Sequence, residues 1–160
     1  MTKGPVPMTA PALKPPLCAA LLTGASLWLG LLLGVSFLAT TVKFNAPSLS
    51  LPVALDVGRA TFTVFNPVEW IMAAILLLLA LGSRRMTIIT TVILVCLALA
   101  AQTFWLLPVL DARVGLILMG TATADSHHHL FYIAADILKT LALTAVIAMA
   151  WSRFTCPRAP

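Results

Sequence analysis

The sequence predicts an all-α polytopic membrane protein, a bundle of four transmembrane helices, and three observations support this prediction. Of the 160 residues, 61% are hydrophobic and only 9% are charged, and the mean hydropathy is +1.04. Soluble domains carry about 25% charged residues, so this composition indicates a membrane protein. Four apolar stretches each approach the roughly 20 helical residues that cross a bilayer. Basic residues flank these stretches at one end, as the positive-inside rule requires.

The transmembrane domain is expected over residues 17–151, with spans at about 17–42, 62–81, 86–107 and 130–151. Residues 1–16 are rich in proline and are expected to form a disordered cytoplasmic tail, and residues 152–160 a second cytoplasmic tail. The connection from Pro52 has helix-compatible spacing and should run into the second span. Pro67 should kink that helix or set its start. The third span could continue as a protruding amphipathic helix that breaks at Gly120.

The basic residues also predict the orientation of the chain. Six of them flank one end of the expected spans: Lys3, Lys14, Arg84, Arg85, Arg153 and Arg158. This end should face the cytoplasm, which places both termini inside (N-in/C-in). No run of Lys and Arg with interleaved aromatic residues occurs, so a nucleic-acid partner is not expected.

Three ionisable residues, Glu69, Asp136 and Lys139, fall inside otherwise apolar spans. A charge at membrane depth is costly, so such residues mark either a buried pairing network or a functional site. A helical rise of about 1.5 Å per residue places all three in the outer leaflet, in one layer with Gln102 and Asn66.

The fourth span carries a polar stripe. His129, Tyr132, Asp136 and Lys139 follow one another at intervals of three or four residues, so their side chains share one face. Exposing this face to lipid would be expensive, and we therefore expect it to point at the second and third spans.

The buried charges do not balance, because Glu69 and Asp136 oppose Lys139 alone. One carboxyl must be protonated, paired with Arg59 or Lys43 from the rim, or neutralised by a bound cation. We expect Arg59 to close an architectural ion network. A pocket for a proton, a cation or another ligand is the alternative.

The three adjacent histidines, His127, His128 and His129, begin the fourth span. Adjacent helical residues point about 100° apart, so the triplet alone cannot form a tridentate metal site. His129 and Asp125 could together hold Zn or Cu, although histidines that face the aqueous loop are the favoured interpretation. Bis-histidine haem within one chain is excluded, because no other span contains a histidine. The cofactor, if any, stays unknown.

Small residues repeat every four positions along the first span, at Ser26, Gly30 and Gly34. Such a stripe lets another helix approach closely. We expect it to pack against another helix of the same chain, with dimerisation as the alternative.

Four stretches together carry a resemblance: GLLLGVSF in the first span, KFNAPSLSLPVALDVGRATF leading into FNPVEW, QTFWLLPVLDAR at the end of the third span, and H-x-x-Y-x-x-x-D-x-x-K from His129 to Lys139. In their order and content they resemble a group of small bacterial four-helix membrane proteins that are distantly similar to the animal transmembrane protein 205 family. The resemblance covers most of residues 24–150. It implies the architecture and a bacterial inner (cytoplasmic) membrane, but no reaction, cofactor or substrate. His127 and His128 are not part of the pattern.

The favoured function is non-catalytic: an accessory or stabilising subunit of a membrane complex, whose partners are the lipid bilayer and other membrane subunits or a second copy. The alternative is binding or transport of a proton, a metal cation or a small amphiphile through an oligomeric bundle. A membrane enzyme is the third possibility, but no serine or cysteine nucleophile motif accompanies the histidines.

Overall fold

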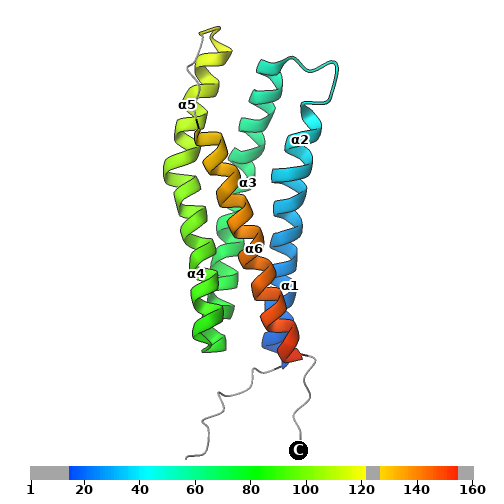
Figure 1. Cartoon of the computed structure of the whole chain (residues 1–160), viewed down its shortest axis with the longest axis vertical. Coiled ribbons are helices and arrows are strands. Elements are labelled where there is room, and N and C mark those ends of the chain that lie inside the picture. Colours follow the sequence, from blue (N-terminus) through cyan, green and yellow to red (C-terminus); the bar gives the residue numbers. More distant parts are fainter. Residues whose placement is uncertain (1–14, 122–126, 155–160) are drawn as a thin grey trace, which may run out of the picture.

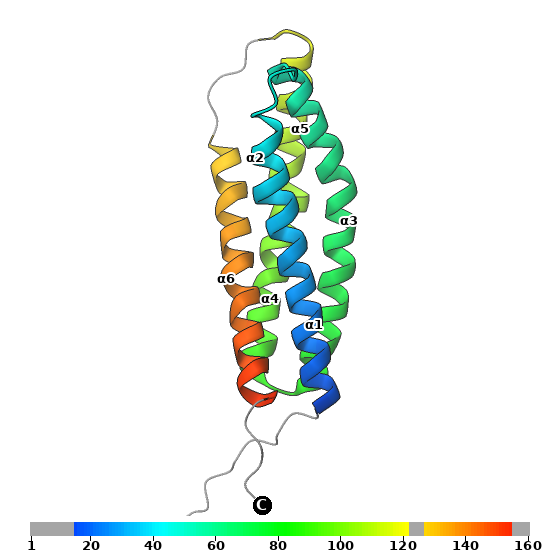
Figure 2. The same cartoon turned by 90° about the vertical axis from the view of Figure 1, so that its right-hand side faces the viewer.

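The computed structural model describes residues 15–121 and 127–154, and these residues form four long helical rods that run side by side (Figure 1 and Figure 2). Each rod is 26 to 33 residues long and apolar enough to cross a membrane: Pro15–Lys43, Leu51–Ser83, Met86–Leu118 and His128–Arg153. The predicted all-α class with four membrane-length helices is therefore confirmed. The expected tails lie mostly outside the described residues.

The first rod consists of helix α1 (Pro15–Leu32), a π-helical segment η1 (Leu33–Ala39) and the short helix α2 (Thr40–Lys43). Helix α1 buries residues at intervals of three and four, so that a single face meets helices α3 and α6: Cys18, Leu21, Ala25, Trp28 and Leu32. In η1 no residue is buried, and the wider π turns begin where this tight packing ends.

The second rod is one continuous helix, α3 (Leu51–Ser83). Pro52 lies in its first turn, where the missing N–H would have had no helical partner. Pro67 lies inside the helix and does not set its start, because membrane helices can accommodate proline within the spanning segment. The helix ends where Arg84 adopts a left-handed conformation with φ 52°, which makes the tight turn into the next helix.

The third rod comprises α4 (Met86–Ala101), a second π-helical segment η2 (Gln102–Leu106) and α5 (Leu107–Leu118). It therefore continues past the expected span as a helix and ends just before Gly120, whose φ is +74°. The fourth rod is helix α6 (His128–Phe154).

The four rods form a closed ring in which each packs on two neighbours. Helix α6 packs on α1 and α4, and α3 packs on the same two helices from the other side. The start of α1, the turn between α3 and α4 and the end of α6 all lie at one end of the bundle (Figure 1). The core between the rods is apolar, and its largest fully buried side chains include Trp28, Leu76, Leu99 and Leu143.

The expected packing of Ser26, Gly30 and Gly34 inside the chain is wrong. Ser26 and Gly30 are exposed and Gly34 is half-buried, and a Cβ added at either glycine would meet nothing within 4 Å. The neighbouring face of α1 carries the larger side chains, among them Trp28 and Leu32, and these fill the core to the density that protein interiors require.

This arrangement predicts opposite effects for the same new side chain at two positions of α1. We expect Ala25→Leu to lower the free energy of unfolding by about 1–3 kcal/mol, because Ala25 is fully buried and the added atoms overpack the core. Gly30→Leu should change it by no more than about 0.5 kcal/mol, because the site is open. Denaturation in detergent micelles, followed by circular dichroism, measures both. Equal destabilisation would contradict the assignment of the core face.

Candidate functional site

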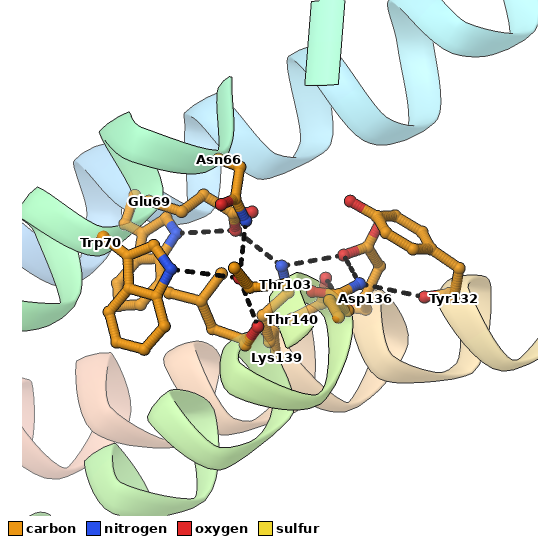
Figure 3. A network of polar contacts seen from close by, with 11 residues as sticks. Asn66, Glu69, Trp70, Thr103, Tyr132, Asp136, Lys139 and Thr140 are labelled. Carbon is orange, nitrogen blue, oxygen red and sulfur yellow. Dashed lines mark hydrogen bonds and ion pairs between the residues drawn. The ribbon is translucent and has the colours of Figure 1, made fainter. Parts of the chain in front are cut away.

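Lys139 is the centre of a buried ion network that joins α3 to α6 (Figure 3). Its Nζ lies 2.6 Å from Glu69 Oε1 on α3 and 3.0 Å from Asp136 Oδ1, one turn earlier on α6. The three side chains are only 0–4% exposed. The structure thus brings together the three charges that the sequence had placed in one layer.

Two further side chains extend the network to the remaining rods. Trp28 on α1 donates its indole N–H to Glu69 Oε1 at 3.2 Å. Gln102 on η2 donates through Nε2 to Asp136 Oδ1 at 2.8 Å and to the Tyr132 backbone carbonyl at 3.2 Å. All four rods therefore meet at this layer.

The part played by Trp28 was missed in the sequence. A buried indole N–H nearly always finds an acceptor, so the one tryptophan of the first span was a usable signal. The sequence did identify Gln102, but it did not show which carboxylate this amide contacts.

Asn66, which was expected in this network, belongs to a separate polar cluster beside it (Figure 3). Its Nδ2 donates to Thr103 Oγ1 at 2.8 Å, and the Trp70 indole donates to the same oxygen at 3.1 Å. Thr103 Oγ1 in turn donates to the Leu99 carbonyl. This cluster fastens α3 to η2 without contributing charge.

The expectation that Arg59 neutralises the second buried carboxylate is wrong. Arg59 instead pairs with Asp111 on α5 at 3.7 Å, with side chains that are 42% and 43% exposed. The physical reason is distance, because ten helical residues place Arg59 about 15 Å along α3 from Glu69. Lys43 is also engaged elsewhere: its Nζ lies against the bare backbone at Gly58, where an added Cβ would collide with it. Among the described residues, Lys139 is thus the single cation in contact with the two carboxylates.

A pocket with a volume of about 420 Å³ lies next to the network, on the side of the connection between α2 and α3. Asp136 and Tyr132 form its floor, since they are the lining residues of α6 farthest from the helix start. Its rim carries charged and polar side chains, namely Lys43, Arg59, Asp111 and His129. Its walls are apolar: Phe37, Phe44, Leu55, Phe62, Leu107, Leu110, Val114 and Ile133.

Several polar groups at this layer have no partner among the described residues. Ser36 Oγ, which belongs to the pocket lining, and Gln102 Oε1 are both buried without a hydrogen bond. Figure 3 likewise shows no contact to the Tyr132 hydroxyl, whose ring packs edge-on against Phe62 at 5.3 Å. A buried polar atom without a partner costs about 1–3 kcal/mol, so these groups are suited to meet a ligand.

The histidines lie at the start of α6, away from the ion network. His129 is exposed at the pocket rim, and His128 packs near the Trp105 ring. In residues 15–121 and 127–154, no group of three or more His, Cys, Asp or Glu side chains could hold a metal ion. The suggested metal pair of His129 and Asp125 stays a prediction, because Asp125 lies outside the described residues.

In comparisons with protein-family models, with curated proteins and with solved structures, the chain matches none of them. The resemblance to the transmembrane protein 205 family therefore stays a prediction.

The shared lysine predicts an asymmetry between two charge-removing substitutions. We expect Lys139→Met to lower the free energy of unfolding by about 3–5 kcal/mol, because it leaves two buried carboxylates without a cation. Glu69→Gln should cost clearly less, because Asp136 and Lys139 then form a balanced pair. Reversible denaturation in mixed micelles measures both. If Glu69→Gln is as costly as Lys139→Met, the charge imbalance does not govern the stability of the network.

Proposed function

We propose that this protein is an integral membrane protein that binds a small amphiphilic ligand in the pocket of its outer half. The pocket is the observation that carries this proposal. Small-molecule sites are typically concave, about 300–1,000 Å³ in volume and mostly apolar, with a few polar groups that orient the ligand. The present pocket has this volume and this distribution of groups.

The imbalance of the ion network supports binding over a purely architectural role. A buried ion network favours stability only when its charges are paired and its hydrogen bonds are complete. Here Glu69 and Asp136 share the ammonium of Lys139, and Ser36 Oγ and Gln102 Oε1 have no partner within the described chain. A ligand in the pocket would supply part of what is missing.

An accessory role in a larger membrane complex is the second candidate, and the surface of α1 favours it. Ser26, Gly30 and Gly34 leave an open strip on the bundle surface. A helix of another subunit or of a second copy could approach closely there. Binding of a ligand and association with a partner are compatible, since they use different faces of the first rod.

We further propose that the protein lies in a bacterial inner membrane with both termini in the cytoplasm. The turn with Arg84 and Arg85 lies at the same end as the start of α1 and the end of α6 (Figure 1), and clustered basic residues favour the cytoplasmic side. At the opposite end Arg59 is balanced by Asp111. The pocket then belongs to the outer half of the membrane.

Cysteine labelling tests this orientation. In a chain whose own cysteines are replaced by serine, Ser48→Cys should react with a membrane-impermeant maleimide in intact spheroplasts, because Ser48 lies in the connection between α2 and α3. Ser152→Cys, at the other end of the bundle, should react only after lysis. The reverse pattern would overturn the orientation.

Blocking the pocket tests the binding function. We expect the protein in nanodiscs to bind phenylbutanol or its charged analogue phenylbutylamine saturably, as measured by calorimetry against empty nanodiscs. Ile133→Trp should abolish the binding, because Ile133 lines the pocket. Leu141→Trp is the matched control, since Leu141 is 64% exposed on the same helix. The proposal fails if neither compound binds or if both variants behave alike.

A further inference from the structure

We propose that the ligand of this pocket is an amphiphilic ammonium cation whose charged end lies against Asp136. This inference rests on the proposed binding function and adds the chemical class of the ligand. It follows from the charge of the floor, the free acceptor that the floor presents and the composition of the walls.

The buried charges favour a positive ligand. With both carboxylates ionised, Glu69, Asp136 and Lys139 leave one negative charge in excess, on side chains that are 0–4% exposed. Interactions with such charges are strong because little water screens them. The rim has the opposite excess, from Lys43 beside the Arg59–Asp111 pair, but that pair is 42% and 43% exposed, and exposed charges are well screened. The floor therefore determines the sign of the ligand.

Asp136 also has an acceptor to offer. Its contacts with Lys139 and Gln102 both use Oδ1, which leaves Oδ2 without a described partner. Asp136 is part of the pocket lining, and the Tyr132 hydroxyl is a second uncommitted group there. An ammonium group could donate to both, and a charged donor roughly doubles the strength of such hydrogen bonds.

The walls distinguish an organic cation from a metal ion. Calcium and magnesium require about six or more oxygen ligands, whereas the lining is mostly apolar and no cluster of ligating side chains occurs in the described ranges. Aromatic rings near the floor, including Phe62 and Tyr132 at 5.3 Å from each other, suit an ammonium group through cation–π attraction. The volume of 420 Å³ leaves room for an apolar body.

A matched series of ligands tests the inference on the unmodified protein. Phenylbutylamine, phenylbutanol and phenylbutyrate have the same apolar body and differ in charge. By calorimetry in nanodiscs of neutral lipid at pH 7, we expect the amine to bind about ten- to a hundredfold more tightly than the alcohol, and the acid most weakly. Equal binding of amine and alcohol would overturn the inference and leave the proposed function intact. Binding of neither would instead remove the proposed function.

A pair of identical substitutions locates the charge selectivity. Asp136→Asn should abolish the preference for the amine over the alcohol, because it removes the excess negative charge at the floor. Asp56→Asn is the matched control, since Asp56 is exposed on α3 and is not among the residues that line the pocket. If Asp136→Asn retains the preference, or if Asp56→Asn removes it, the cation does not bind where we place it. If Asp136→Asn fails to fold, the ligand series on the unmodified protein decides.

Discussion

The contact on which the rest of the structure depends is the ammonium of Lys139 between two carboxylates. Helices in lipid gain little from the hydrophobic effect on association, so packing and polar contacts must hold them together. Through Glu69, Asp136, Trp28 and Gln102 this one layer connects all four rods. It also fixes their register, because sliding α6 by one turn would move Lys139 about 5.4 Å from Glu69.

The layer divides the bundle into two unlike halves. On the cytoplasmic side of our proposed orientation, α6 continues with the fully buried residues Leu143, Val146 and Ala150, and the rods close on a dry apolar core. On the other side, Ile133 and His129 of the same helix line the pocket. The tight half holds the carboxylates in place, and the open half gives access to one of them.

The sequence predicted what depends on depth along a helix and missed what depends on the neighbour across the bundle. The rise per residue was sufficient to place Glu69 and Lys139 in one layer. It could not show that Asp111 on α5 comes within reach of Arg59, because that requires the relative positions of two helices. For the same reason the sequence identified Gly30 as a small residue that another helix could approach, but did not show that this face of α1 points away from the other rods.

The two π-helical segments, Leu33–Ala39 and Gln102–Leu106, adjoin the pocket on different rods. A π turn accommodates about one residue more than an α turn, so loss of that residue would rotate the following helix by about 100°. A single-residue deletion after Gln102 would thus turn α5 and Asp111 relative to the pocket while Gln102 itself stays in the core. Relatives of this chain could therefore acquire a different pocket mouth through changes in length alone, with the residues of the ion network untouched.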